Sequence, residues 1–315
     1  MSDTTTSLVV GGGGFLGRSV VRALERIGDQ VVVPRVPWGD TEAAAEVLVE
    51  AVAGLRAGTT PWRLVWCAGT GIVTTGDDAF TAERELLERV LDPAATAPGT
   101  DGGAAGTAFL ASSAGATYAG SDGVPFDETT EPRPLAPYGR TRLVAEQRFA
   151  SWADAVGARL VIGRIANLYG PGANLDKPQG LVSQLAAAHV EGRTSSIYVP
   201  FSTTRDYLYI DDAGAMVAGA LELVAEQPAG TVVTKIFASQ RGHSIAEVVS
   251  AVGAAFGEDL RIERGQHDSA GLHGLDLRFR STVLPELDDR SLMPFDEGVR
   301  RTVDAVRTAR GGHRA

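Results

Sequence analysis

Three glycines near the start of the chain have a spacing that suits the binding of a pyrophosphate. Gly11, Gly14 and Gly17 follow one another as G-x-x-G-x-x-G. An apolar run over residues 8–10 precedes them, and a helical pattern begins directly behind them. A strand, a tight turn and a helix in this order bring unpaired backbone N–H groups and the positive end of a helix to one point. This context favours a dinucleotide site over a purely structural turn or a flexible linker.

The elements that must position this loop are indicated by an alternation of short apolar runs and helical patterns. Such an alternation predicts a parallel sheet that is covered by helices on both faces. The segment 93–106, rich in small and polar residues, is expected to be a loop. The predicted strands are 8–10, 30–33, 63–67, 107–111 and 159–165, and the predicted helices are 16–27, 41–55, 80–91 and 141–156.

Beyond residue 170 the pattern loosens, and two interleaved lobes are expected. Asp211 and Asp212 are expected to cap the helix that follows them. The fold class is α/β, a Rossmann-type doubly wound parallel sheet with a smaller α+β C-terminal lobe. The dinucleotide-binding domain covers 7–180, with 205–240 returning to it, and the substrate-binding lobe covers 181–204 and 241–310. The predicted helices here are 181–191, 213–226, 244–256 and 296–310, and the predicted strands are 231–238 and 259–263.

Composition bounds the class of protein. The chain has 315 residues and a formal net charge of −10, which argues against nucleic-acid binding. Its hydrophobic content of 44% is enough for a core without disulfides, and Cys67 is the single cysteine, expected to be an unreactive core thiol. A reducing, cytoplasmic compartment is expected. The polar start and the short apolar run after it predict neither a signal peptide nor a membrane span. The histidines lack metal-ligand spacing, so no metal is expected.

Four further segments, together with the glycine loop, carry a resemblance to a known family. Their order and spacing resemble the extended short-chain dehydrogenase/reductase family, in particular its sugar-nucleotide epimerases and dehydratases. The resemblance covers almost the whole chain, and the ending at 284–303 is similar as well. It implies an enzyme that binds a nicotinamide dinucleotide and a nucleotide sugar. The four segments are 109–118 (FLASSAGATY), 137–146 (PYGRTRLVAE), 164–172 (RIANLYGPG) and 204–212 (TRDYLYIDD).

By this resemblance, Tyr138 is the acid/base residue, and the family's lysine four residues on is replaced by Arg142. Free tyrosine has a pKa of about 10, so a neighbouring cation is needed to hold a phenolate near neutral pH. Four residues along a helix place two side chains on one face. Arg142 supplies a cation and hydrogen bonds for a ribose, although a guanidinium does not release its proton in proteins.

The family's hydroxyl partner of the tyrosine is displaced in this chain. Its usual position is Ala114, and Ser113 is the nearest substitute, with Ser112 and Thr117 behind it. For these hydroxyls a structural role at the end of the strand and a catalytic role are both open. The expected catalytic set is therefore Tyr138, Arg142 and Ser113.

The resemblance also implies the cofactor contacts. NAD-preferring members carry an acidic residue at the end of the second strand, whereas this chain has Arg35 there and Arg18 behind the glycine loop. These cations suit the 2′-phosphate of NADP, so NADP is the expected cofactor and NAD is the alternative. For Arg35 itself, the alternative is an arginine that is exposed to solvent and binds no cofactor. The segment 37–60 is short for the family, so one strand is expected to be reduced or missing. The further contacts expected are Phe15, Leu16, Ala68 and Ile165, besides Gly11, Gly14, Gly17, Tyr138 and Arg142.

On the substrate side the resemblance implies a nucleotide sugar. Asn167 matches an asparagine that contacts it. Arg205 matches an arginine that resembles a diphosphate clamp, which suits bidentate guanidinium–phosphate bonding; a surface ion pair, for example with Asp206, is the alternative. Gln179, beside Gly180, lies in the loop that lines the substrate entrance in relatives.

Three functions stay open at this point. Epimerisation by transient hydride transfer is favoured over dehydration, because Gly115 and Ala116 stand where dehydratases carry an Asp–Glu pair. An NADPH-dependent carbonyl reductase is favoured by Arg35. A catalytically weak NADP-binding sensor or scaffold is favoured by Ala114 and Arg142. Relatives often dimerise through two helices, and the helices after residues 80 and 141 would supply such a face for a homodimer.

Overall fold

The core of the protein is a parallel sheet. The computed structural model describes residues 4–69, 77–97, 104, 106–177, 180–265 and 274–311. Within this part of the chain six strands pair in the order β2-β1-β3-β4-β5-β9, and every neighbouring pair is parallel. The expected α/β doubly wound sheet is thereby confirmed. The strands are β1 (Thr6–Val10), β2 (Gln30–Val32), β3 (Trp62–Trp66), β4 (Gly106–Ser113), β5 (Arg159–Ile165) and β9 (Val232–Phe237).

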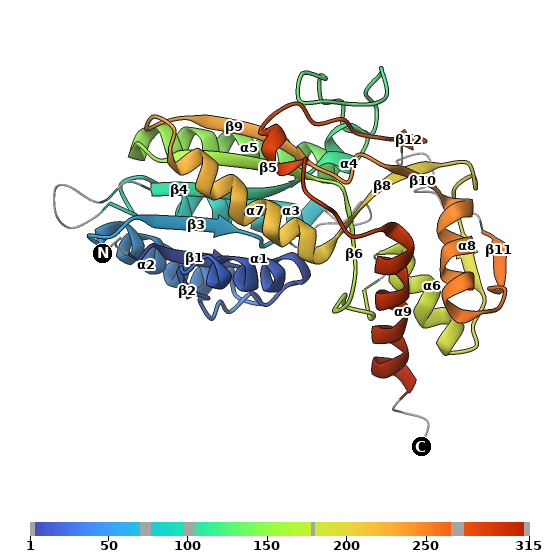
Figure 1. The fold of residues 1–315 in the computed structure, drawn as a ribbon. Coiled ribbons are helices and arrows are strands. Elements are labelled where there is room, and N and C mark those ends of the chain that lie inside the picture. Colours follow the sequence, from blue (N-terminus) through green and yellow to red (C-terminus); the bar gives the residue numbers. More distant parts are fainter. Residues whose placement is uncertain are drawn as a thin grey trace.

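Helices cover both faces of this sheet (Figure 1). Alternate residues of a strand point to opposite faces, so in β1 Leu8 and Val10 pack into one apolar cluster and Val9 into the other. The first cluster is closed by α2 (Thr41–Ala57), α3 (Asp77–Val90) and α5 (Pro137–Val156), and the second by α1 (Phe15–Arg26) and α7 (Ile210–Ala225).

The order of the strands sets where a ligand can bind. The chain runs from β1 outward to β2 and then returns to β3 on the other side of β1. In open α/β sheets the crevice at such a reversal, beyond the carboxyl ends of the strands, is the usual ligand site. Among the described residues β2 is the edge strand and nothing pairs beyond it. The shortened segment after β2 thus lacks a strand, as its length predicted.

A second group of elements lies beyond the carboxyl end of the sheet (Figure 1). Strand β8 (Thr204–Tyr209) is central to it and pairs with β6, β10 and β12. Tyr207 and Tyr209 on one face of β8 pack with the apolar sides of three helices, while Leu208 packs against the core of the main sheet. The remaining elements are α4 (Ala114–Thr117), β6 (Asn167–Tyr169), α6 (Leu181–Val190), β7 (Ser195–Ile197), β10 (Gly242–Ser244), α8 (Ile245–Phe256), β11 (Ile262–Arg264), β12 (Asp276–Leu277), the 3-10 turn η2 (Pro285–Leu287) and α9 (Phe295–Gly311).

Helices α7 and α5 begin earlier than expected. Helix α7 begins at Ile210 behind the N-cap Tyr209, so Asp211 and Asp212 lie inside its first turn and do not cap it. The Asp211 carboxylate instead pairs with Arg22 at 2.6 Å, and that of Asp212 accepts the backbone N–H of Met293 at 2.8 Å. Helix α5 begins one turn before residue 141, with proline at its first position, where the missing N–H costs no hydrogen bond.

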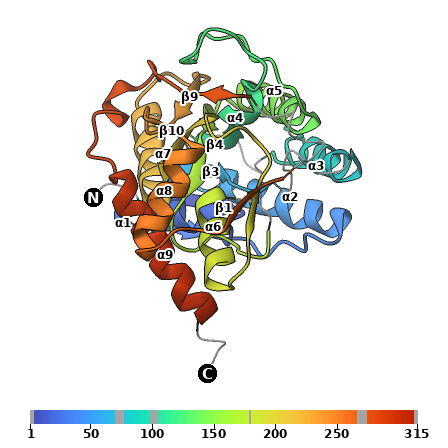
Figure 2. The ribbon, with the colours of Figure 1, turned by 90° about the vertical axis from the view of Figure 1, so that its right-hand side faces the viewer.

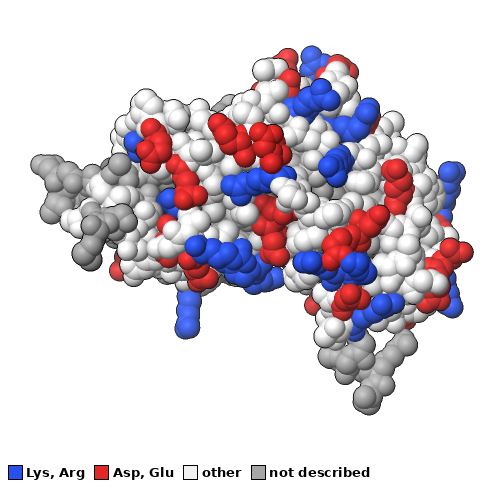
Figure 3. Space-filling view, in the orientation of Figure 1, with Lys and Arg blue, Asp and Glu red and all other residues white. Residues whose placement is uncertain are grey.

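The surface carries charges of both signs. On the face drawn in Figure 3, acidic and basic side chains lie interspersed rather than in separate fields. No described helix is both long and apolar enough to cross a membrane. The described residues contain no group of three or more His, Cys, Asp or Glu side chains arranged to hold a metal ion.

Candidate active site

The glycine loop lies between the carboxyl ends of β1 and β3 and is packed backbone against backbone. Gly11 has a φ of +81°, in the left-handed region. A Cβ on Gly11 would lie 2.6 Å from the Ala68 nitrogen, and one on Gly17 would lie 2.1 Å from the Gly11 oxygen. Ala68 follows β3, next to Cys67, which is partly buried and not in the core as expected. Burial raises the pKa of the Cys67 thiol to about 12. The expected contacts Gly11, Gly17 and Ala68 therefore meet at one point.

The start of α1 fits the pyrophosphate of a dinucleotide. Its N-cap is Gly14, and no side chain of the described residues caps it. The first turn, which begins with Phe15 and Leu16, contains no acidic residue. Backbone N–H groups and the positive helix end are thus left for an anion. Ile165, the last residue of β5 and buried, lies at the same carboxyl edge of the sheet.

The two arginines expected at the 2′-phosphate differ in their surroundings. Arg18 donates to the Gly13 oxygen and to the Gly172 oxygen, each at 2.5 Å, and so ties the glycine loop to the loop that follows β6. Arg35 is exposed behind β2 and has no ion-pair or hydrogen-bond partner among the described residues. Only Arg35 of these two therefore keeps an uncommitted guanidinium.

Tyr138 and Ser113 are brought together, although they lie on different elements. Tyr138 is in the first turn of α5, directly behind Pro137. Ser113 ends β4 and caps the short helix α4 through the Ala116 N–H, at 3.3 Å. The Ser113 side chain is near enough to Tyr138 to lower the pKa of the phenol. The strand end and the helix start thus bring together two of the residues expected to form the catalytic set.

The other hydroxyls near this strand end form hydrogen bonds within the protein. Ser112 donates to the Glu146 carboxylate at 2.6 Å. Glu146 in turn binds the guanidinium of Arg164 at 2.7 Å, and Arg164 donates to the Tyr118 hydroxyl at 2.6 Å. Thr117 donates to the Ser113 backbone oxygen at 2.9 Å. Of the hydroxyls considered, Ser113 is therefore the one that contacts Tyr138.

Arg142 contacts the aromatic ring of Tyr138, and it also has an acidic partner that was not predicted from the sequence. Its guanidinium carbon lies 5.4 Å from the centre of the Tyr138 ring, within range of a cation–π contact. Arg142 also forms an ion pair with Glu83 of α3, and the two side chains are 3% and 8% exposed. The ring of Phe80, also on α3, stacks on that of Tyr138 with centroids 6.3 Å apart. The only local signal for Glu83 is its place in a helix that packs beside α5.

These neighbours shift the pKa of Tyr138 in opposing directions. Burial raises the pKa of the phenol, the Arg142 charge lowers it, the Glu83 charge raises it, and the hydrogen bond with Ser113 lowers it. Burial dominates, and the pKa lies above the ordinary value for tyrosine. In the protein alone, the phenol therefore holds its proton at neutral pH.

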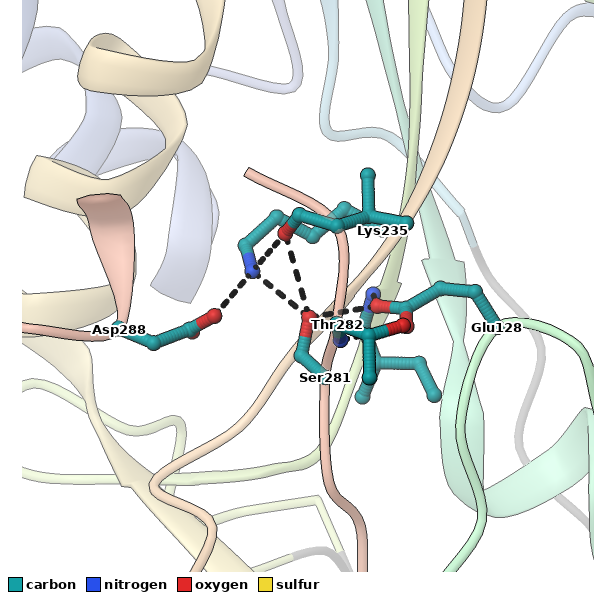
Figure 4. A network of polar contacts seen from close by, with 7 residues as sticks. Glu128, Lys235, Ser281, Thr282 and Asp288 are labelled. Carbon is teal, nitrogen blue, oxygen red and sulfur yellow. Dashed lines mark hydrogen bonds and ion pairs between the residues drawn. The ribbon is translucent and has the colours of Figure 1, made fainter. Parts of the chain in front are cut away.

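Lys235, one of the chain's two lysines, is held in a network of polar contacts (Figure 4). Its fully buried ammonium donates to Ser281 Oγ at 2.7 Å, to the Val283 oxygen at 2.7 Å and to Asp288 at 2.8 Å. All three N–H bonds are thus used to hold the segment 281–288 against β9. Glu128 binds the same segment from the other side, accepting from Ser281 at 2.6 Å.

The expected substrate residues lie on the small sheet around β8. Asn167 donates to the backbone oxygen of Asp206 at 3.0 Å. Arg205 is 8% exposed, donates to the Thr204 oxygen at 2.9 Å and lies opposite His243 of β10. Gln179 lies outside the described residues, and Gly180 caps α6.

Arg205 and Asp206 do not pair with each other, because successive residues of β8 point to opposite faces. One Asp206 oxygen accepts from the Ser239 N–H at 2.8 Å, and the other has no partner among the described residues. Burial raises the pKa of Asp206 to about 7. Arg205 therefore does not form the surface ion pair with Asp206 that the sequence left open as its alternative role.

Comparison with known sequences places this chain in a family of enzymes. A model described as "NAD dependent epimerase/dehydratase family" matches residues 73–234, just over half of the chain. The chain is 27% identical to UDP-glucose 4-epimerase of Rhizobium meliloti over 84% of its own length and 87% of the relative. It is 30% identical to dTDP-L-rhamnose 4-epimerase of Burkholderia thailandensis, over 41% of its own length and 35% of the relative. A 2′-dehydrokanamycin reductase of Streptomyces kanamyceticus is 30% identical over 70% of the chain and 58% of the relative.

Solved structures share the whole fold. UDP-glucose 4-epimerase of Thermus thermophilus in complex with NAD superposes with a TM-score of 0.77 at 24% identity, covering 96% of this chain and 99% of that one. UDP-glucose 4-epimerase of Thermotoga maritima with UDP-glucose gives a TM-score of 0.78 at 21% identity, with the same coverage of 96% and 99%.

Proposed function

Because the chain belongs to the NAD dependent epimerase/dehydratase family, we propose that it epimerises a nucleotide-activated sugar by transient hydride transfer with NAD(P). The observation that carries this proposal is the meeting of Ser113, Tyr138 and Arg142 where β4 ends and α5 begins. When bound, the nicotinamide would accept a hydride from a sugar carbon and return it. Tyr138 would take the proton of the sugar hydroxyl and give it back. Ser113 would orient that oxygen, and Arg142 would stabilise the phenolate.

Epimerisation rather than dehydration is proposed because the acid/base pair of a dehydratase has no counterpart here. Elimination of water needs one group to take a proton and another to protonate the leaving hydroxyl. Gly115 and Ala116 occupy α4 at this point and carry no titratable side chain. The keto intermediate would therefore be reduced again, with the hydride returned from either face of the sugar.

The cofactor proposed is NADP, because Arg35, three residues after β2, has no ion-pair or hydrogen-bond partner among the described residues. We expect the dissociation constant of NADPH to be lower than that of NADH, and Arg35→Ala to weaken NADPH alone, about 10-fold. Titration by fluorescence measures both constants. Arg26→Ala, an exposed arginine in the last turn of α1, is the matched control. Equal constants for the two cofactors, or tighter NADH, would contradict this choice.

The nucleotide sugar is proposed to lie between the glycine-loop domain and the lobe of 181–204 and 241–310. Arg205 is the proposed diphosphate contact, since its guanidinium is buried without a carboxylate partner among the described residues. Asn167 and Gln179 are proposed to contact the sugar nucleotide. A homodimer through α3 and α5 is proposed by analogy with relatives alone.

The decisive experiment uses the purified protein and UDP-glucose as the probe. The small molecules that the purified protein retains are extracted and identified by their mass. The conversion of UDP-glucose to UDP-galactose is then followed. A retained cofactor with interconversion of the two sugars supports the proposal. Tyr138→Phe should abolish turnover, by about 1000-fold or more, with cofactor affinity unchanged. Full turnover in Tyr138→Phe would remove the acid/base assignment.

An NADPH-dependent carbonyl reductase is the second candidate, favoured by the 2′-dehydrokanamycin reductase among the relatives and by Arg35. A reductase consumes one NADPH per product and exchanges it freely, so the cofactor would be absent from the extract. Binding of cofactor without turnover of any keto or sugar-nucleotide compound would instead favour a sensor or scaffold.

A further inference from the structure

The ion pair between Glu83 and Arg142 lies where the two halves of the proposed site meet. A Cβ on Gly69, behind β3, would lie 3.4 Å from an Arg142 nitrogen and 3.7 Å from a Glu83 oxygen. The pair is thus held directly beneath the loop that adjoins the glycine loop. On its other side is the ring of Tyr138. Helices α3 and α5, which carry the two residues, pack side by side (Figure 2).

The pair is unusual for a purely structural contact because it is buried and incompletely satisfied. Glu83 Oε2 and Arg142 Nε are buried and have no hydrogen-bond partner among the described residues. A buried ion pair adds little net stability, since the desolvation of both charges offsets their attraction. The surface pair of Glu88 and Arg148, which joins the same two helices at 2.6 Å, already links them with both charges in solvent.

The charge next to Tyr138 is therefore that of a pair and not that of a free cation. The charged groups that act here are Glu83 from α3 and Arg142 from α5, with Glu146 one turn farther along α5 acting on Arg142. A guanidinium cannot shed its charge in a buried place as a lysine can. Without Glu83 a permanent charge would remain buried beside the phenol.

We propose that Glu83 is a positioning residue for Tyr138, which holds the Arg142 guanidinium against the tyrosine ring and offsets part of its charge. Arg142 then lowers the pKa of the phenol, and Glu83 limits that effect. This inference rests on the proposed role of Tyr138 as the acid/base. It assigns to Glu83 an effect on the proton affinity of the phenol, which a contact that merely joins two helices would not have.

The test measures that proton affinity directly and needs no turnover. The protein is labelled with 13Cζ-tyrosine, the Tyr138 signal is identified by its loss in Tyr138→Phe, and its chemical shift is followed against pH. Glu83→Gln keeps an oxygen that can accept from Arg142 but removes the opposing negative charge. We expect its Tyr138 midpoint to fall by about one pH unit. Glu88→Gln, on the same helix and also facing an arginine of α5, should leave the midpoint unchanged.

An unchanged midpoint in Glu83→Gln, or an equal shift in Glu88→Gln, would overturn the proposal. Where Glu83→Gln does not fold, Arg142→Lys is compared with Arg142→Lys combined with Glu83→Gln, because an unpaired lysine is tolerated more readily. The combined variant should have the lower midpoint, and equal midpoints would again overturn the proposal. A shifted midpoint without turnover of any sugar nucleotide would uphold the positioning role and contradict the proposed function instead.

Discussion

Ser113 is the residue whose loss most directly tests the proton chemistry at Tyr138. Its hydrogen bond lowers the pKa of the phenol, so in Ser113→Ala that pKa should rise and the acid limb of the kcat/KM profile should move to higher pH. We also expect kcat to fall about 100-fold, as when one preorganised hydrogen bond to the reacting oxygen is lost. Ser121→Ala, whose hydroxyl donates to the Glu131 oxygen, is the control. A profile identical to that of the natural protein would exclude Ser113 from the site.

Asp206 makes the stability of the fold depend on pH. In the folded chain burial raises its pKa to about 7, against 3.8 for an ordinary aspartate. Between these values the folded state binds more protons than the unfolded state, so its contribution to stability falls as pH rises. Asp206→Asn removes this loss and keeps an acceptor for the Ser239 N–H. From pH 4 to pH 7 the variant should gain up to about 4 kcal/mol relative to the natural protein in urea unfolding. A constant difference would show that Asp206 does not titrate in this range.

At the scale of elements, the close approach of α1 to the glycine loop is tested at Gly17. A methyl group there would meet the Gly11 oxygen at 2.1 Å, so Gly17→Ala must push the helix away from the strand. We expect a loss of about 1–3 kcal/mol in the free energy of unfolding and a cofactor affinity at least about 10-fold weaker. Gly13→Ala is the matched control, because no atom lies within 4 Å of its added Cβ. Equal affinities for the two variants would argue that α1 does not hold the pyrophosphate.

The helices and strands that could be located from the sequence are those whose apolar residues recur with a clear periodicity. Strand β1 and helix α1 each show an uninterrupted apolar pattern, and both lie within two residues of their expected bounds. Strand β8 was missed because Arg205 and Asp206, although buried, interrupt the apolar run that marks a strand buried on both faces. The three-residue strands β6 and β10 are too short for any period to show. Asp211 and Asp212 resembled a cap only because nothing local indicates their partners Arg22 and Met293.

The site was predictable where it depends on local motifs. The glycine loop, Tyr138 and Ser113 each lie in a contiguous segment with its own pattern, and the fold brings Tyr138 and Ser113 together. Glu83 was not predictable, because its partner Arg142 is 59 positions away along the chain. In sequence Glu83 reads as one of several charged residues on a solvated helix face, and only the packing of α3 against α5 buries it.

For the molecule as a whole, Lys235 fastens the segment 281–288 to the main sheet. Lys235→Met would leave Asp288 buried without its cation, and we expect a loss of about 3–5 kcal/mol in the free energy of unfolding. Lys177→Met, at an exposed lysine, should change little. The double variant Lys235→Met with Asp288→Asn should recover part of the loss, since no charge is then left unpaired. Denaturant unfolding measures all three, and a small effect of Lys235→Met would indicate that water replaces the ammonium.

The ion pair of Glu83 and Arg142 makes the evolutionary histories of two distant positions interdependent. Either residue changed alone strands a buried charge, so each single step passes through a less fit intermediate. A lineage that exchanges lysine for arginine at position 142 gains by acquiring an acid at position 83, and losing that acid afterwards is disfavoured. We therefore expect the two positions to change together, because only a change at one compensates for a change at the other.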